Sequence, residues 1–286
     1  MTTPDLALHP AAQPACKACG GRGVVIERSG ELATAHRCAC VGRCPACDDS
    51  GWVATADDWR APQRRCSCQK LNLRITAFDA IKIPGRHANS TLDNYDVSVS
   101  RSASRAWMGA RSVVSTWTPG RESRGFILHG PVGTGKTHLM TAVLRELVLT
   151  HGISARFVEF SHLIADLRST FDTRNGGAGA LLAELVDVDV LAIDELGKGR
   201  NTEWEGTVLD ELVSRRYNAA ATVLGTTNFE PGTSGNAVAN AARAYATTPM
   251  LGDRVSDRVQ SRLYELCDFL ALPGTDWRTR RNRPPS

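Results

Sequence analysis

The sequence predicts an α/β fold, a parallel sheet flanked by helices, preceded by a small zinc-ribbon-like module. Three observations lead to this prediction. From about residue 100, strand-like apolar runs alternate with helix-like segments, which is the pattern of a doubly wound parallel sheet. A glycine-rich loop joins the first of these runs to the helix after it. Eight of the nine cysteines fall between residues 16 and 68, ahead of the alternating pattern.

The cysteines form a repeat, because C-x₂-C, 18 intervening residues and C-x-C recur 28 residues later. Each unit can supply four thiolates to a structural zinc ion, and disulfides are disfavoured in a cytosolic protein without an export signal. We therefore predict two zinc ions. Their ligand sets stay open: the sites are either sequential, one per repeat, or interleaved as in the DnaJ cysteine-rich region, which the spacing resembles. The predicted ligands are Cys16, Cys19, Cys38, Cys40, Cys44, Cys47, Cys66 and Cys68.

The other cysteine and a nearby histidine receive no metal role. His36 lies beside Cys38, but a full set of thiolates leaves it no vacancy. Cys267 lies in a strand-like segment and is expected to be a buried apolar thiol.

The segment between the cysteines and the alternating pattern is expected to be a helical linker. Apolar residues recur at helical spacing over residues 69–81, and Pro84 ends this helix. Residues 91–95 are expected to form an entry segment, and residues 100–117 an amphipathic helix before the first strand of the sheet.

Residues 130–137 read G-x-x-x-x-G-K-T between an apolar run, 126–128, and a helix-like segment, 138–150. This context predicts a phosphate-binding loop, because glycines let successive backbone N–H groups point at phosphates and the helix adds its positive dipole end. Lys136 is expected to reach the phosphate oxygens of ATP, in binding and in catalysis, and the Thr137 hydroxyl to hold Mg²⁺. The expected nucleotide contacts are Gly130, Pro131, Val132, Gly133, Thr134, Gly135, Lys136, Thr137 and His138.

An acidic pair, Asp194-Glu195, follows the apolar run 185–193, which suits a strand buried on both faces of a parallel sheet. Strand ends carry the chemistry in such sheets. We expect Asp194 to hold Mg²⁺ through its water shell and Glu195 to orient and deprotonate the attacking water. The next strand, 222–227, ends at Asn228, whose amide is expected to position that water.

The rest of the alternation completes the expected sheet. Ser161 is expected to cap the helix after the strand 155–160. Residues 232–248 are small and polar, and we expect a loop insertion there. The further expected elements are helices 178–185 and 203–218 and strands 188–193 and 267–272.

Composition agrees with a soluble globular protein. The chain has 286 residues, 42% of them apolar, and its net charge of +4 is too small to indicate nucleic-acid binding by itself. No apolar stretch approaches the roughly 18 residues that span a bilayer, and the first residues lack the pattern of an export signal. We therefore expect a cytoplasmic protein with no membrane contact.

From residue 91 to about residue 278 the chain resembles the AAA+ ATPases of the DnaC/DnaI bacterial replicative helicase-loader family, with IstB transposition helpers close behind. The motifs that carry the resemblance are LDNY, GPVGTGKTHL, DVLAIDELG, the helix with DEL and RR at 210–216, TTN at 226–228 and LGDRVSDR at 251–258. The last motif is the most discriminating of these.

The resemblance assigns roles to several polar residues. Arg258 is expected to be an arginine finger that enters the neighbouring subunit's nucleotide site, with Arg254 as its partner and self-association through the Arg258 face. Arg278 resembles a sensor arginine at the nucleotide, and Asn228 matches the sensor 1 position at the end of its strand. Only about fifteen residues follow the strand 267–272, so we expect no C-terminal helical lid.

The expected domains are a disordered tail 1–15, a tandem zinc module 16–68, a helical linker and entry segment 69–99, an AAA+ ATPase domain 100–278 and a basic tail 279–286. The arginines near that tail are expected to be solvated or to contact DNA or a partner. They are Arg278, Arg280, Arg281 and Arg283.

The resemblance implies a helicase loader that uses ATP, binds single-stranded DNA and reaches a replicative helicase through its zinc module. Two alternatives stay open: an IstB-like transposition helper, and a zinc-based adaptor with a slow nucleotide switch. The sequence does not decide which helicase is the partner or how many subunits assemble.

Overall fold

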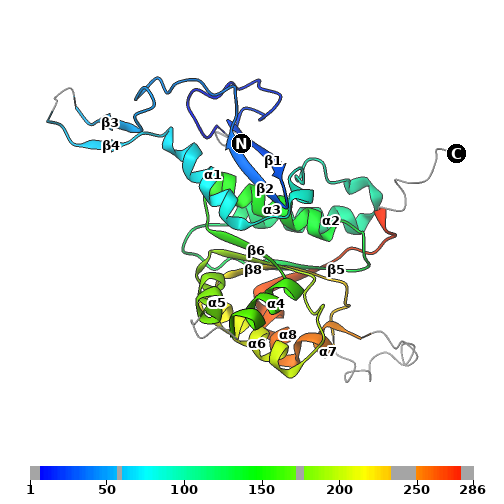
Figure 1. Ribbon diagram of the computed structural model, residues 1–286. Helices are drawn as coiled ribbons and strands as arrows, with labels where there is room; N and C mark the ends of the chain where they lie inside the picture. The colour runs from blue at the N-terminus through cyan, green and yellow to red at the C-terminus, as the bar shows by residue number, and fades with distance from the viewer. Residues whose placement is uncertain (1–6, 57–59, 172–176, 233–248, 278–286) are drawn as a thin grey trace. The chain divides into compact units, whose positions relative to one another are not determined.

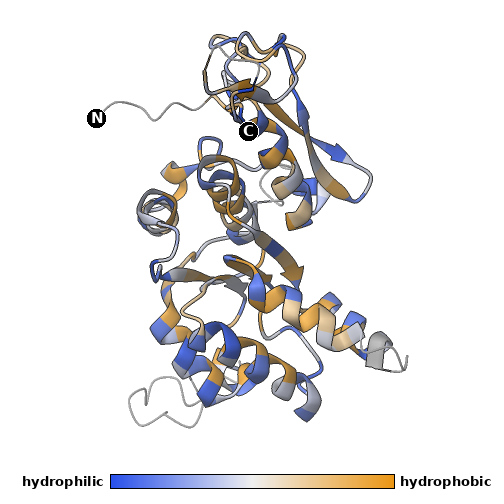
Figure 2. Cartoon of the chain, turned by 90° about the vertical axis from the view of Figure 1, so that its left-hand side faces the viewer, coloured by the Kyte–Doolittle hydropathy of each residue, from blue (hydrophilic) through white to orange (hydrophobic). Residues whose placement is uncertain are grey.

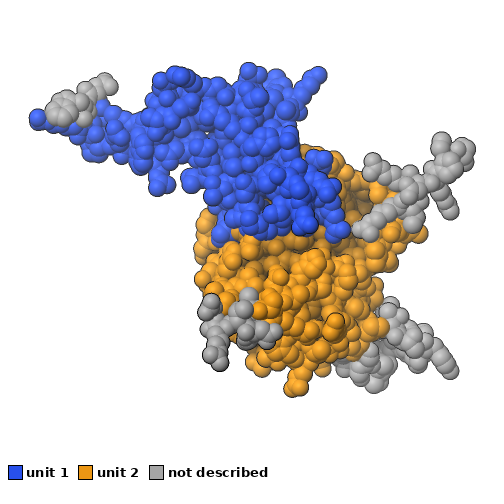
Figure 3. Space-filling model, viewed as in Figure 1, with its two compact units in different colours: residues 1–89, 147–154 blue, residues 90–146, 155–286 orange. Residues whose placement is uncertain are grey.

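The computed structural model describes residues 7–56, 60–171, 177–232 and 249–277. The chain divides into two compact units. Unit 1 comprises Met1–Asn89 with Leu147–Ser154, and unit 2 comprises Ser90–Glu146 with Ala155–Ser286 (Figure 3). Unit 2 thus begins before the expected boundary at residue 100, and the entry segment belongs to it.

A five-stranded sheet forms the centre of unit 2. Its strands run parallel in the order β6-β7-β8-β5-β9 (Figure 1), which is the doubly wound parallel sheet that the alternating pattern predicts. The first strand in sequence is therefore an interior strand, so later strands flank it on both sides. The strands are β5 (Gly125–His129), β6 (Ala155–Glu159), β7 (Val190–Asp194), β8 (Thr222–Thr227) and β9 (Cys267–Ala271).

Helices cover both faces of this sheet. On one face, Ile127, Ile193 and Val223 share an apolar core with helices α4 to α8. On the other, α2 lies so close to β9 that a Cβ at Gly109 would stand 2.9 Å from Leu270. The strands are largely hydrophobic and the flanking helices carry both colours, as amphipathic helices do (Figure 2). The helices are η2 (Val97–Val99), α2 (Arg101–Thr116), α3 (Lys136–His151), α4 (Phe160–Phe171), α5 (Gly177–Asp187), α6 (Glu203–Asn218), α7 (Leu251–Val255) and α8 (Asp257–Leu266).

Most expected boundaries agree with the structure, but two expectations are wrong. Ser161 does not cap α4, because the helix begins one residue earlier at Phe160 and the Ser161 hydroxyl donates to the carboxylate of Glu159 at 2.7 Å. β7 begins at Val190, not at Val188, because α5 extends to Asp187. The expected loop 232–248 lies outside the described residues apart from its first residue.

Arg216 on α6 explains where β7 starts. Its side chain is fully buried, and burial lowers the pKa of its guanidinium to about 10. The guanidinium donates to backbone carbonyls at the end of α5, in the turn before β7 and at the start of β8, so it fixes these three elements together. The acceptors are the carbonyls of Leu185, Val186, Val188, Asp189 and Thr222.

Unit 1 is built from two antiparallel hairpins and a helix. The first hairpin packs on α1, and the carboxylate of Asp79 accepts the Ala35 N–H at 2.8 Å. The elements are β1 (Val24–Ser29), β2 (Leu32–Arg37), β3 (Trp52–Ala54), β4 (Gln63–Arg65), α1 (Gln69–Ile81) and the short helix η1 (Gly85–His87).

Part of the expected tail 1–15 packs within unit 1. Residues 1–6 lie outside the described residues, but Leu8, His9 and Ala12 are buried. The Leu8 N–H donates to the Arg22 carbonyl at 3.0 Å, so these residues pack on the first cysteine loop. None of the described helices has the length and apolar character that crossing a membrane requires.

We expect Arg216→Met to lower the free energy of unfolding by at least about 3 kcal/mol, because several buried carbonyls lose their donor at about 1–3 kcal/mol each. Urea denaturation followed by circular dichroism measures the change.

The neighbouring Arg215 provides the matched control. It is half exposed and pairs with Glu211 at 2.9 Å on the same helix, so Arg215→Met should cost at most about 0.5 kcal/mol. Equal losses in the two variants would show that the carbonyl contacts of Arg216 do not carry the effect.

Candidate nucleotide site and metal centres

The predicted phosphate-binding loop runs from the end of β5 to the first residue of α3. Gly130 and Gly135 adopt φ values of 138° and 91°, which side chains rarely tolerate. A Cβ at Gly130 would also stand 2.4 Å from the Leu272 carbonyl oxygen. Only glycine fits there, so the loop can curl closely over the start of α3, with its backbone N–H groups available to an anion.

Lys136 is buried inside this loop. Its ammonium donates to the carbonyls of Gly130 and Pro131, both at 2.7 Å. The positive charge of Lys136 therefore lies inside the phosphate loop, where phosphate oxygens are expected. The same two contacts join the first residues of the loop to the start of α3.

Asp194 is the most buried carboxylate of the site, at the carboxyl end of β7. The Thr137 hydroxyl donates to its two oxygens at 3.0 and 3.2 Å, and the Thr226 hydroxyl donates at 2.5 Å. Burial raises the pKa of Asp194, while these two hydroxyls act in the opposite direction. The donor set of one carboxylate and one hydroxyl fits Mg²⁺, which takes oxygen ligands and shares its shell with phosphates.

Thr226 was not predicted from the sequence as a site residue. β8 lies between β7 and β5 in the sheet, and Thr226 stands level with Leu128, just before the loop. Its hydroxyl accepts the Glu195 N–H at 3.0 Å and also holds Asp194. A single threonine therefore positions both acidic residues.

Glu195 follows β7 with a φ of 55°, a left-handed conformation held by the contact of its N–H with Thr226. Its carboxylate pairs with the ammonium of Lys198, which raises the pKa of Lys198.

Glu159, at the end of β6, joins this charged group. Burial acts to raise the pKa of Glu159, but the Ser161 hydroxyl and nearby cations outweigh it, so the pKa is lowered. Lys198 and Glu159 were missed by the sequence analysis.

The other predicted polar residues take different positions. Asn228 is exposed directly after β8, and no hydrogen bond joins it to Glu195 in the described part of the chain. Arg254 is used within its own chain: it donates to the carbonyls of Gly197 at 3.0 Å and Gly199 at 2.5 Å. Arg278 lies outside the described residues.

Arg258 stands on α8 with 69% of its side chain exposed. Its Nε lies 3.7 Å from the carboxylate of Asp210, and Asp210 already binds Arg262 at 2.9 Å. The Arg258 guanidinium is therefore only weakly held by its own chain and is accessible from solvent.

Two segments distant in sequence border the phosphate loop. The Trp277 N–H donates to the Gly133 carbonyl at 3.0 Å, so the chain after β9 runs along the loop. From the entry segment, Tyr95 packs against Gly135 and against the ring of His138, with ring centroids 5.7 Å apart. Burial lowers the pKa of His138, whose Nε2 lies 3.1 Å from the Thr91 carbonyl oxygen.

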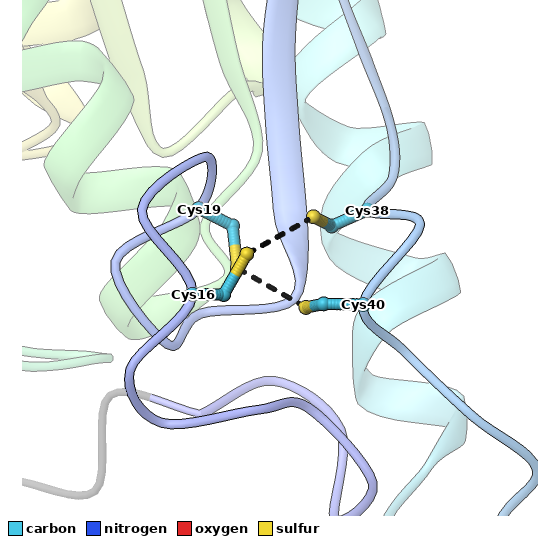
Figure 4. Close-up of side chains that lie close together, drawn as sticks. All are labelled: Cys16, Cys19, Cys38 and Cys40. Atoms are coloured by element: carbon cyan, nitrogen blue, oxygen red, sulfur yellow. Dashed lines mark hydrogen bonds between the residues drawn. The ribbon is translucent and has the colours of Figure 1, made fainter.

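The eight predicted metal ligands gather in two groups of four. Within each group the ligand atoms all lie within 4.8 Å of one another. In Figure 4, Cys16 and Cys19 face Cys38 and Cys40 across the first site, at Sγ–Sγ distances of 3.8 and 3.5 Å. The groups are Cys16, Cys19, Cys38 and Cys40, and Cys44, Cys47, Cys66 and Cys68. The sites are therefore sequential, one per repeat, which decides the alternative that the sequence left open.

The cysteine geometry fits zinc. A tetrahedral ion with Zn–S distances of about 2.3 Å places its sulfurs about 3.8 Å apart. The backbone N–H of Gly23 donates to Cys19 Sγ at 3.3 Å, and the backbone N–H of Gly51 donates to Cys47 Sγ at 3.4 Å, so the two repeats share this contact. All four positions would be filled by protein, which is typical of a structural site.

His36 and Cys267 take no part in these groups. His36 lies beside Glu27, with 3.8 Å between Nε2 and Oε1. Cys267 is buried, as expected, and burial raises the pKa of its thiol, which donates to the Val223 carbonyl at 3.3 Å.

Comparison with known proteins places this geometry in a family. Residues 69–260 match the model of the IstB-like ATP binding proteins. The chain belongs to this family. The matched range contains the phosphate loop, the acidic pair and the LGDRVSDR motif of this IstB-like protein.

Three similar proteins extend the comparison. The replicative helicase loader DnaC of Escherichia coli strain K12 is 29% identical over 185 residues, covering 64% of this chain and 68% of DnaC. The uncharacterized protein YdaV of the same strain is 27% identical over 245 residues, covering 83% of this chain and 87% of YdaV. A crystal structure of the DnaC helicase loader superposes with a TM-score of 0.55 at 28% identity, covering 65% of this chain and 98% of that one.

We expect the purified full chain to contain two zinc ions, because each cysteine group closes its own tetrahedron. Cys38→Ser removes one ligand of the first group and should lower the content to about one ion per chain, since the groups share no ligand. Elemental analysis measures it.

Cys267→Ser is the matched control, because Cys267 belongs to neither group, and it should leave the metal content unchanged. A Cys38→Ser chain that kept both ions, or lost both, would contradict two independent four-cysteine sites.

Proposed function

We propose that this IstB-like protein is an ATP-dependent helicase loader of the bacterial cytoplasm. It binds Mg²⁺ and ATP, assembles with a replicative helicase and single-stranded DNA, and hydrolyses ATP to reset the complex. The observation that carries the proposal is the arrangement of Lys136, Thr137, Asp194 and Glu195 at one edge of the sheet, in a chain that is similar to the loader DnaC over 185 residues.

Nucleotide binding follows from the loop and its lysine. The glycines expose backbone N–H groups at the start of α3, and Lys136 exchanges its carbonyl partners for phosphate oxygens at little cost, because it is already desolvated. Thr137 and Asp194 hold Mg²⁺, which neutralises charge on the phosphates when it is bound.

Glu195 is the residue assigned to the attacking water. The Thr226 hydroxyl holds its backbone, and its carboxylate stands at the edge of the site with its side chain one-third exposed, so water can reach it. To act as a base it must exchange its contact with Lys198 for a water, and Asn228 is assigned to position that water from the end of β8.

Assembly supplies the remaining charge. Arg258 is exposed and weakly paired, which suits a cation that enters the site of a neighbouring subunit. Hydrolysis then depends on self-association through the α8 face. Residues 16–68 form the proposed contact with the helicase. The match to the IstB-like model favours the transposition helper as the second candidate.

We expect Lys136→Ala to weaken ATP binding about 10- to 150-fold, because a charge-assisted contact to phosphate is lost. Glu195→Gln should retain ATP binding and lose about 10²- to 10⁴-fold in turnover, because the glutamate acts on water in the transition state. Equilibrium binding of a fluorescent ATP analogue and steady-state phosphate release measure the two quantities.

The loader activity is tested with the replicative helicase of the same organism on closed single-stranded DNA circles. Wild type should transfer the helicase to the circles in an ATP-dependent manner, and Lys136→Ala should not. If the helicase reaches the circles equally well without this protein, the loader assignment is wrong. Nucleotide-dependent retention of a transposase on DNA would favour the transposition helper instead.

We expect Arg258→Ala to bind ATP normally and to lose about 10³-fold in turnover within an assembly. Mixing the Arg258→Ala and Glu195→Gln variants should restore activity. At some interfaces the Arg258→Ala chain then supplies a nucleotide site with an intact Glu195, and the Glu195→Gln chain supplies an intact Arg258. In a random equal mixture about a quarter of the interfaces have this pairing in a head-to-tail assembly.

Arg215→Ala is the control for loss of an exposed arginine. Arg215 lies on α6, away from the α8 face, and pairs with Glu211 of the same helix, so this variant should keep full turnover. If the mixed chains co-assemble without recovering activity, Arg258 does not act between subunits.

A further inference from the structure

Each four-cysteine group belongs to one half of the zinc module: the first module comprises residues 16–40 and the second module residues 43–68. The two modules share the register of their hairpins as well as the spacing of their cysteines. In the first hairpin, Val24 pairs with Arg37. In the second, Trp52 pairs with Arg65, and both positions lie 28 residues further along the chain. The structural repeat therefore extends over the whole module, so residues at equivalent positions of the two hairpins can be compared directly.

The hairpins differ in what they contact. Val24 is 3% exposed, and Ile26 and Ala35 of the same hairpin are buried as well. The equivalent Trp52 is 45% exposed, and the residue equivalent to Ala35, Gln63, is exposed as well. The second hairpin stands apart from β1 and β2 in Figure 1. The position that builds the core in the first module is thus left to solvent in the second, where a larger aromatic residue occupies it.

One face of the second hairpin combines this aromatic residue with a cation. Cross-strand partners share a face and successive residues alternate, so Trp52, Ala54, Gln63 and Arg65 lie together on it. Val53, from the opposite face, packs on the second cysteine group and holds the hairpin to its metal site. The contact of Val53 with the cysteine group therefore holds the face of Trp52 and Arg65 in place while leaving it exposed.

Arg65 carries an available positive charge. Among the described residues it pairs with no carboxylate, whereas Arg43 of the same module pairs with Asp48 at 3.3 Å. Trp52 and Arg65 are cross-strand partners, and both are exposed. This pair complements a ligand that presents a flat aromatic ring and a negative charge together, which is the chemistry of an unpaired nucleotide.

The size of the face favours nucleic acid over a protein partner. Two strands of three residues span about 10 Å, which suits a base and its phosphate. A stable protein interface needs about 800 Å² and about 20 residues on each side, far more than this hairpin offers. Stacking on one aromatic ring, by contrast, is an effective contact for a single base.

We infer that the β3–β4 hairpin of the second zinc module binds single-stranded DNA, with a base stacked on Trp52 and a phosphate held by Arg65. This site is separate from the nucleotide site of unit 2, and it requires neither ATP nor hydrolysis. Its failure is therefore distinguishable from a failure of the proposed loader function.

Binding of a fluorescent oligothymidine to the full chain without nucleotide tests the inference by anisotropy. Trp52→Ala should weaken binding about 5- to 150-fold, and Trp52→Phe should recover part of it, because phenylalanine still stacks. Arg65→Ala should lower the slope of log affinity against log salt by about 0.7, the value for one phosphate contact on a single strand. Zinc content, measured alongside, shows that the module is intact.

Two controls match these changes. Leu73→Ala removes an exposed apolar side chain of the same unit, and Arg43→Ala removes an exposed but ion-paired arginine of the same module. Neither should change the affinity or the salt slope appreciably. Unchanged binding by Trp52→Ala and Arg65→Ala chains that retain their zinc would overturn the inference. Loss of helicase capture with unchanged DNA binding would also overturn it, because the face would then be a protein contact.

Discussion

The buried carboxylate of Asp194 is the interaction on which the nucleotide site depends. A carboxylate without water needs donors, and the two that reach it belong to α3 and β8. Thr137 thereby ties the first turn after the phosphate loop to the end of β7, and Thr226 ties β8 to the same point. Because Thr226 also holds the backbone of Glu195, the hydrogen bonds around this one carboxylate fix the positions of the proposed magnesium ligands and of the proposed base.

The two units differ in what stabilises them. Unit 2 has an extensive apolar core, and the fully buried guanidinium of Arg216 donates to backbone carbonyls of the elements around it. Unit 1 has a small core that only the first hairpin enters, so each zinc module relies on its four sulfurs for closure. In the second module Trp52 and Gln63 are exposed at the positions where the first module buries Val24 and Ala35, which leaves this face of the hairpin available to a ligand.

The sequence was sufficient where chemistry is local. The phosphate loop, the acidic pair and the two cysteine units are short patterns with fixed spacing, and the alternation of elements predicted the parallel sheet. Thr226, Glu159 and Lys198 could not be predicted, because their roles depend on which strands are neighbours and on how a turn folds back. Arginines are mostly exposed, so the sequence gives no reason to expect that Arg216 is buried. The start of β7 could not be predicted for the same reason, because the turn before it is held by carbonyl contacts of Arg216.

Cys267 gives unit 2 an internal chemical reporter. The thiolate is the reactive form of cysteine, and burial between β5 and the helices keeps this thiol protonated and out of reach of reagents. An alkylating reagent can modify it only when the part of unit 2 around β9 opens. Its rate of labelling therefore measures the opening of unit 2, whereas the eight other cysteines report on unit 1. The stabilities of the two units can be followed separately in one intact chain.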